Sequence, residues 1–182
     1  LYNRLTPAVL AYEGIAFQYM APSVFEIQQF EYLQNHLRIL SAFYGILKPM
    51  DGVTPYRLEM QAKVGIGDAK NLYEYWGELL YRSVIDDSRI IINLASKEYS
   101  KCIEKYLTSQ DRYITIVFCE LFGDKLVTKG TYAKMARGEM VRFIAENNIE
   151  NPVEIQKFDR LGYSFRSDLS SDSEYVFERK IK

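Results

Sequence analysis

Basic side chains are concentrated in one short stretch of this 182-residue sequence. Residues 125–142 hold five Lys or Arg side chains and a single Glu, whereas residues 145–178 hold three basic side chains and eight carboxylates. The formal net charge of −1 therefore hides a basic segment followed by an acidic one. Such a concentration of positive charge is typical of a surface that binds anions such as phosphate groups. The alternative is a pair of solvated faces whose charges balance each other.

The basic segment is predicted to form a helix over residues 132–146, with Thr131 as its N-cap. Small and apolar side chains fill one side of this helix, which is typical of packing against a core. The opposite side carries Lys134, Arg137 and Arg142, with Gly138 in their midst. A helical Gly costs about 1 kcal/mol relative to Ala, so close approach of another backbone or of an anionic ligand would explain Gly138. Both explanations remain open from the sequence.

The counts of histidine and cysteine exclude several kinds of catalytic and metal site. The chain holds one histidine, His36, and two cysteines, Cys102 and Cys119. A two-histidine zinc motif is impossible, and the cysteine spacing fits neither a C-x-x-C redox pair nor a zinc knuckle. We predict that both cysteines are buried as small hydrophobic residues, and we expect neither a metal site nor a cofactor. A Cys–His nucleophile pair involving His36 remains open, but no motif supports it.

The stretch Gly65-Ile66-Gly67 resembles the hairpin glycines of helix-hairpin-helix DNA-binding motifs, or a piece of a nucleotide-binding loop. No clear strand precedes it, and the residues after it do not continue a phosphate-binding fingerprint. The favoured interpretation is a plain loop between Met60 and a helix that begins at Asn71.

Helical periodicity and apolar runs alternate along the chain. Helices are predicted over residues 24–35 (capped by Ser23), 41–47, 71–85, 97–106 and 132–146, with a short one opening at Pro152. Strands are predicted over residues 37–40, 89–94, 113–118, 125–128, 163–166 and 175–179, the third and fourth of them joined by a turn at Gly123-Asp124. This interleaving predicts a mixed α/β fold, α+β in character, with residues 1–182 forming a single compact domain. No apolar run approaches the ~20 residues that a membrane helix needs, so no membrane partner is expected.

Several phrases, taken in their order along the chain, are more specific than these patterns. They are His36–Ser41, Tyr44–Pro49, Pro55–Met60, Leu72–Gly77, Ile92–Tyr99, Tyr132–Gly138 and Arg142–Ile144. In this order they resemble the YaaA family of bacterial peroxide-stress proteins, and the resemblance extends through Tyr175–Phe177. Members of that family begin with a short strand and a Ser-Pro-Ala-Lys-Thr-like segment, none of which precedes Leu1. We therefore expect that the chain is truncated at its N-terminus.

The resemblance implies an unusual mixed fold, a cytoplasmic location and a role in limiting free intracellular iron and oxidative damage during peroxide stress. It also implies DNA binding, including binding to distorted duplexes, through a positively charged cleft. The expected phosphate contacts come from Arg38, Arg57, Lys97, Lys134, Arg137 and Arg142. Tyrosines near these cations could stack on unpaired bases.

Two other functions remain open from the sequence. Polar residues within the same phrases could converge with Lys134 and Arg57 on the pocket of an enzyme that acts on a nucleobase or nucleotide. The residues that would line this pocket are Glu59, Asn93, Ser96, Glu98 and Tyr99, and no nucleophile–base pair is recognisable among them. Direct iron binding would use the hard carboxylate oxygens of Asp168, Asp172 and Glu174. For these three residues an acidic, solvated loop is the favoured interpretation.

Overall fold

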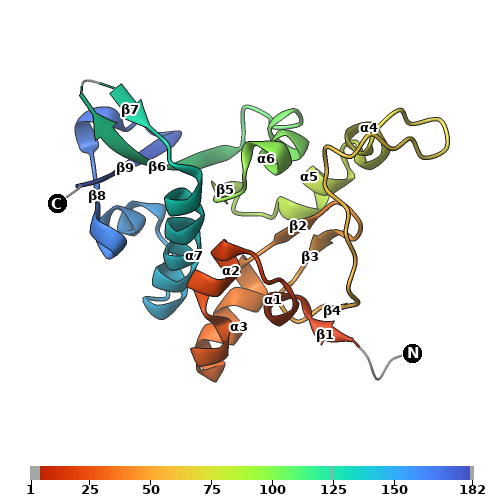
Figure 1. The fold of residues 1–182 in the computed structure, drawn as a ribbon, viewed down its shortest axis with the longest axis horizontal. Coiled ribbons are helices and arrows are strands. Elements are labelled where there is room, and N and C mark those ends of the chain that lie inside the picture. Colours follow the sequence, from red (N-terminus) through yellow and green to blue (C-terminus); the bar gives the residue numbers. More distant parts are fainter. Residues whose placement is uncertain (1–4, 124, 181–182) are drawn as a thin grey trace. The chain divides into compact units, whose positions relative to one another are not determined.

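The polypeptide folds into helices and strands (Figure 1), and these group into two compact units. A computed structural model describes residues 5–123 and 125–180, so Leu1 and Asp124 lie outside the described residues. Unit 1 comprises Leu1–Ala11 and Leu37–Tyr113, and unit 2 comprises Tyr12–His36 and Ile114–Lys182. Helices and strands occur in both units, which confirms the mixed α/β class. The assignment of residues 1–182 to one domain stays a prediction.

Unit 1 combines short strands with short helices. Its elements are β1 (Thr6–Pro7), α1 (Ala8–Ala11), β2 (Ile39–Ser41), β3 (Gly45–Leu47), β4 (Gly52–Val53), α4 (Leu72–Trp76), α5 (Leu79–Val84), β5 (Ile90–Asn93) and α6 (Lys97–Glu104). Strands β1 and β4 pair antiparallel, and so do β2 and β3. The predicted strand at 89–94 and the predicted helix at 97–106 are confirmed.

The helix predicted over residues 41–47 is wrong, because this segment is the β2–β3 hairpin. The Oγ of Ser41 accepts hydrogen bonds from the backbone N–H groups of Phe43 (3.2 Å) and Tyr44 (2.9 Å), which closes the turn. A serine oxygen that binds nearby backbone donors competes directly with helix formation. Gly45 follows at φ +82°, where a Cβ would lie 2.9 Å from the ring of Trp76. The hairpin therefore needs both the serine and the glycine.

The single helix predicted over residues 71–85 is two helices, α4 and α5. Asn71 caps the first one, because its side chain accepts a hydrogen bond from the Glu74 N–H at 2.9 Å. Gly77 ends that helix at φ +50°, a backbone conformation that glycine adopts without strain. The loop before α4 contains Gly65-Ile66-Gly67, where Ile66 bridges to Ala69 across a tight turn, so the loop interpretation is confirmed.

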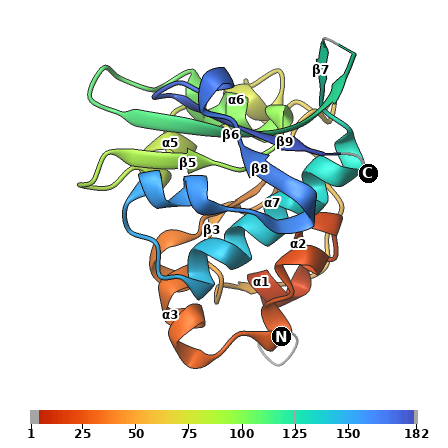
Figure 2. The ribbon, with the colours of Figure 1, turned by 90° about the vertical axis from the view of Figure 1, so that its left-hand side faces the viewer.

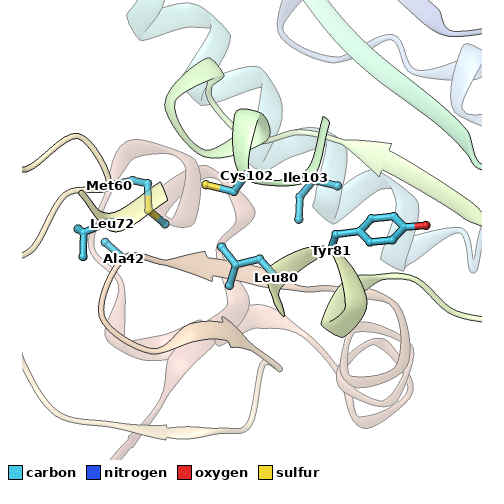
Figure 3. Close-up of a cluster of buried hydrophobic side chains, with 7 residues drawn as sticks. All are labelled: Ala42, Met60, Leu72, Leu80, Tyr81, Cys102 and Ile103. Atoms are coloured by element: carbon cyan, nitrogen blue, oxygen red, sulfur yellow. The ribbon is translucent and has the colours of Figure 1, made fainter. Parts of the chain in front are cut away.

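A cluster of buried side chains forms the core of unit 1. Its members come from the hairpin turn, the loop before α4, and helices α4, α5 and α6: Ala42, Met60, Leu72, Leu80, Tyr81, Cys102 and Ile103 (Figure 3). Tyr81 turns its hydroxyl away from the other labelled side chains, and this hydroxyl donates to Asp111 Oδ2 at 2.8 Å. Burial of apolar surface stabilises the folded state by roughly 25 cal/mol per Å². The cluster thus fixes the hairpin turn against the helices.

Unit 2 contains a sheet and a long helix. Its elements are α2 (Ile15–Met20), the 3-10 turn η2 (Pro22–Val24), α3 (Ile27–His36), residues 114–122 of β6 (Arg112–Phe122), β7 (Lys125–Val127), α7 (Gly130–Glu146), the 3-10 segments η3 (Pro152–Lys157), η4 (Arg160–Gly162) and η5 (Ser167–Leu169), β8 (Tyr163–Phe165) and β9 (Glu174–Arg179). Strand β9 pairs parallel to β6 and antiparallel to β8. The predicted pairing of β7 with β6 (Figure 2) is confirmed, and Leu121 lies opposite Leu126.

Two predicted helix caps in unit 2 are wrong. Helix α3 begins at Ile27, and Ser23 lies in the preceding 3-10 turn. Helix α7 begins at Gly130, so Thr131 is already helical and Lys129 occupies the N-cap position. The short helix at Pro152 is a 3-10 helix, capped by the Asn151 side chain, which accepts from the Val153 N–H at 3.1 Å.

Aromatic side chains form one part of the core of unit 2. The ring of Phe118 lies 5.8 Å from that of Phe158, 5.1 Å from that of Tyr163 and 5.6 Å from that of Phe177, centroid to centroid. These distances fall in the range where aromatic pairs contribute beyond their buried area. Among the described residues, no helix combines the length and apolarity required to cross a membrane.

Candidate nucleic-acid interface

Helices α2 and α7 belong to unit 2 (Figure 1), and Gly138 of α7 lies against the backbone of α2. A Cβ built on Gly138 would lie 2.0 Å from the backbone oxygen of Ala16 and 2.8 Å from the backbone nitrogen of Met20. The close approach that the sequence left open is therefore that of a helix backbone. An anionic ligand is not needed to explain this glycine.

The basic residues around Gly138 differ in whether a carboxylate offsets their charge. The Nε of Arg142 lies 2.7 Å from Glu146 Oε1, and Arg160 from η4 contacts both Glu139 (3.1 Å) and Glu146 (2.5 Å). Burial works to raise the pKa of Glu146, but hydrogen bonds from Arg142 and Arg160 outweigh it and lower that pKa. The charge of Arg142 is thus largely offset within unit 2.

Lys134 and Arg137 on the same helix have no such partner among the described residues. Lys134 is exposed, and it makes no ion pair with any residue that the structure describes. Arg137 is half-buried, and its Nε is buried without a hydrogen-bond partner among residues 5–123 and 125–180. Burial lowers the pKa of Arg137, because removal from water disfavours the charged guanidinium. An anion that reached this guanidinium would supply the counter-charge that the described residues do not.

The three remaining sequence-predicted cations belong to unit 1. Arg57 lies on the extended segment after β4, and Lys97 opens helix α6; both are exposed, and neither has an ion-pair partner in the described part of the chain. Arg38 is half-buried and donates from Nη1 to the Leu37 carbonyl at 2.9 Å. Each unit therefore carries three of the six predicted phosphate contacts.

The polar residues of the enzyme hypothesis also lie in unit 1, apart from Lys134. Asn93 ends β5 and is buried, and its Oδ1 accepts from the Ala95 N–H at 3.0 Å. Ser96 is the N-cap residue of α6, but its side chain makes no capping hydrogen bond. Burial raises the pKa of Tyr99 to about 12, and the nearby charges of Glu98 and Glu59 act in the same direction. Asn93 and Ser96 thus define the β5–α6 turn, and Tyr99 lies close to Glu59.

The family assignment rests on comparison with known proteins. The model of the family described as peroxide stress protein YaaA matches residues 2–169. This chain belongs to the YaaA family. A UPF0246 protein of Agathobacter rectalis is 87% identical over 181 residues, which cover 100% of this chain and 73% of that relative. UPF0246 proteins of Lachnoclostridium phytofermentans and Desulfitobacterium hafniense are 59% and 55% identical; the matches cover 97% of this chain each, and 69% and 70% of the relatives.

Because the family is described as a peroxide-stress family, the state of the two cysteine thiols matters. Cys102 and Cys119 are both buried, as the sequence predicts. Burial raises the pKa of Cys102 to about 11 and also raises that of Cys119. Peroxide reacts with the thiolate form of cysteine, so burial disfavours this reaction at both residues. His36 faces oxygen atoms at both ring nitrogens, with the Tyr32 carbonyl 2.8 Å away and Glu150 3.4 Å away.

Asp168, one of the three acidic residues considered for iron, is engaged elsewhere in this member of the YaaA family. Both oxygens of Asp168 accept from Arg166, at 2.8 and 2.7 Å. That hydrogen bonding lowers the pKa of Asp168. Within the described ranges, no group of three or more His, Cys, Asp or Glu side chains is arranged to hold a metal ion.

A buried ionic network in unit 2 was not predicted from the sequence. Glu120 on β6 is 1% exposed, and its carboxylate meets Arg179 from β9 (2.5 Å) and Lys129 (2.9 Å). The guanidinium of Arg179 also covers the Tyr132 ring, 3.5 Å from its centroid. A hydrogen bond from Lys129 outweighs burial and lowers the pKa of Glu120. Lys129 was counted in the basic segment, yet its charge serves the fold of unit 2.

An aromatic group on the hairpin of unit 1 was also missed. Phe43 stacks on Tyr56 at 5.3 Å between centroids, and Tyr44 meets both rings edge-on. The Phe43 ring remains 55% exposed. A phenylalanine in a short apolar run is predicted to lie in the core, because nothing in the neighbouring sequence shows that it lies at the tip of a turn.

Proposed function

We propose that this chain binds DNA and that it acts in peroxide stress by limiting free iron and the oxidative damage it causes. Support for the stress role is its membership in the YaaA family. Support for DNA binding is the set of exposed or unpartnered cations described above. The proposal includes the positively charged cleft and the cytoplasmic location that the resemblance implies.

The observation that carries the DNA-binding proposal is the state of Lys134 and Arg137 on helix α7. Both cations lack carboxylate partners in the described ranges, although acidic residues on and near the same helix neutralise Arg142. The helix that presents them is fixed against α2 through Gly138. Cations held without counter-charges on a fixed helix suit phosphate groups, whose contacts position a protein on DNA without reading its sequence.

The other predicted cations take graded roles in the proposal. Arg57 and Lys97 are exposed and unpaired within the described residues, so they offer further phosphate contacts from unit 1. Arg142 contributes less, because Glu146 offsets its charge. Arg38 contributes less as well, since its guanidinium already donates to a backbone carbonyl.

Binding of a fluorescein-labelled 20-base-pair duplex, followed by fluorescence anisotropy, tests the proposal. We expect the double variant Lys134→Ala with Arg137→Ala to lose at least about tenfold in affinity at low salt, irrespective of the DNA sequence. The matched control is Arg82→Ala with Lys157→Ala, which removes the same amount of charge from exposed residues paired to Glu78 and Glu154. Equal affinity of the two double variants would contradict the proposed contacts.

We also propose that iron is limited indirectly and not by storage on this chain. Support comes from Asp168, whose carboxylate is bound by Arg166. Titration of the purified protein with ferrous iron under anaerobic conditions should show no stoichiometric binding. A site that binds one iron per chain would contradict this part of the proposal.

A further inference from the structure

The β6–β7 hairpin (Figure 2) exposes apolar side chains on both of its faces. The pairing of β6 with β9 ends at Glu120, so the tip of the hairpin extends beyond β9. Leu121 and Leu126 lie opposite each other on one face, and each is 46% exposed. Phe122 belongs to the other face, because side chains alternate along a strand, and it is 74% exposed. An exposed apolar surface of this kind is typical of a site of protein association.

Strand β7 also has a free edge. It pairs with β6 along one side, and no strand among the described residues pairs with its other side. The N–H and C=O groups along such an edge are available to a further strand. All three residues of β7 are exposed, and Lys125, the charged residue among them, stands at the end of the strand. The edge therefore suits a strand that brings apolar side chains and keeps its own cations away from Lys125.

A second copy of β7 meets these requirements in one register. In a symmetric antiparallel pair the two-fold axis passes through one central position, and each residue lies opposite a residue of the other copy. A centre at Lys125 would set two lysines opposite each other, and a centre at Val127 would set Lys125 opposite Lys129 of the second copy. Like charges directly opposite each other destabilise a strand pair. A centre at Leu126 avoids both arrangements, because Lys125 then lies opposite Val127.

The register centred on Leu126 also joins the apolar surfaces of the two copies. Leu126 of one copy would lie opposite Leu126 of the other, and each copy already places Leu121 beside Leu126 on the same face. Four leucines then form a continuous row across four strands, which removes their exposed apolar surface from water. Strands of three residues bury less surface than a standard interface, so the dimer is weak and forms as the concentration rises.

We propose that the free edge of β7 is a self-association site, at which two copies of this chain pair antiparallel about Leu126. The occupant is a second copy because the sequence of β7 itself satisfies the backbone, apolar and charge requirements of the edge in one register. Self-association at β7 does not depend on the proposed DNA binding, since Lys134 and Arg137 lie on helix α7, outside the strand pair.

Sedimentation velocity over a hundredfold range of protein concentration, up to about 0.5 mM, tests for self-association. We expect the average mass of the wild type to rise from that of one chain towards that of two. Leu126→Lys sets two ammonium groups opposite each other, so its dissociation constant should rise at least about tenfold. Leu79→Lys, on helix α5 of unit 1 and 60% exposed in the wild type, is the matched control and should associate like the wild type.

Disulfide formation tests the register independently of affinity. Both native cysteines are buried, so they do not compete for cross-linking. Cα atoms directly opposite each other in antiparallel strands lie about 4.5 to 5.5 Å apart, within the range of a disulfide. We therefore expect diamide, which takes up the two thiol hydrogens, to link Leu126→Cys into a covalent dimer. Val127→Cys should form little of this dimer, because in the proposed register its thiol faces Lys125 of the second copy.

Salt separates this contact from DNA binding. The two Lys125 side chains lie on the same face of the joined sheet, so salt screens their repulsion and should strengthen the dimer. Binding to phosphate groups weakens under the same change. A wild type that stays monomeric at about 0.5 mM in both low and high salt would overturn the proposal. Equal association of Leu126→Lys and the wild type would overturn the site, and equal cross-linking of Leu126→Cys and Val127→Cys would overturn the register.

Discussion

Within each unit of this chain, the fold pairs some charges and leaves others without an ion-pair partner among the described residues. In unit 2 Glu120 pairs with Arg179 and Arg142 pairs with Glu146, whereas Lys134 and Arg137 on helix α7 have no carboxylate partner in the described ranges. In unit 1 the buried carboxylate of Asp111 pairs with Arg89 at 2.6 Å, whereas the exposed cations Arg57 and Lys97 have no ion-pair partner in the part of the chain that the structure describes. The difference shows that charge counts along a sequence do not locate a binding surface. What matters is which charges the fold has already neutralised.

Removal of the Glu120 carboxylate should give the largest loss of stability. Glu120→Ala leaves Arg179 and Lys129 without their shared partner, and breaking a buried ion pair costs about 3 to 5 kcal/mol. Urea unfolding should show a loss of this size. The exposed pair in unit 1 is the control, since Glu78→Ala should cost no more than about 0.5 kcal/mol. Similar losses in the two variants would contradict the contrast between a buried and an exposed ion pair.

The helix contact at Gly138 should give the next largest effect. Gly138→Ala places a Cβ against the backbone of Ala16, and overpacking of this kind costs about 2 to 3 kcal/mol. Gly130→Ala, in the first turn of the same helix with nothing within 4 Å, should be neutral or stabilising. Thermal or urea unfolding of the two variants measures the difference. A neutral Gly138→Ala would mean that α2 and α7 are less tightly packed than described.

Ser41 offers the corresponding test in unit 1. Ser41→Ala removes the acceptor for two backbone N–H groups and the donor to Tyr56, which should cost about 1 to 2 kcal/mol. The control is Ser83→Ala, because that exposed hydroxyl only donates to the Leu79 carbonyl of its own helix. Its expected cost is below about 0.5 kcal/mol. Equal stability of Ser41→Ala and the wild type would show that the hairpin turn does not depend on the serine.

Low pH should destabilise unit 2, because it protonates the Glu120 carboxylate that Glu120→Ala removes. The folded pKa of Glu120 lies below its ordinary value of 4.5, so its stabilisation is present above that pH. It is lost as the pH falls below 4.5 and through the folded pKa. Stability measured by urea unfolding between pH 7 and pH 3 should decline less steeply for Glu120→Gln than for the wild type. Parallel declines would remove Glu120 as a source of the acid sensitivity.

Much of the fold could be predicted from local pattern. The strand at 89–94, the helix at 97–106 and the β6–β7 pairing follow from periodicity and turn chemistry. The hairpin at 39–47 could not be predicted in this way. Its short apolar run suits either a helix or a strand, and the decision depends on Ser41 and on the distant Trp76.

The types of residue at the candidate site could be predicted from the sequence. The sequence did not show which of their charges have an ion-pair partner in the described structure. Glu146 stands four residues after Arg142, and that spacing could have indicated their pairing. The partner of Gly138 is Ala16, which lies 122 positions earlier in the chain, and no local signal identifies it. The same holds for Glu120, whose partner Arg179 comes from the neighbouring strand.

The central claim is that cations without an ion-pair partner in the described part of the chain, above all Lys134 and Arg137, bind DNA phosphates. The most direct measurement is the slope of log affinity against log salt for a paired duplex. The account predicts that Lys134→Ala with Arg137→Ala lowers the magnitude of this slope by about two, and that Arg82→Ala with Lys157→Ala leaves it unchanged. An unchanged slope in the first double variant, or an equal reduction in both, would contradict the claim.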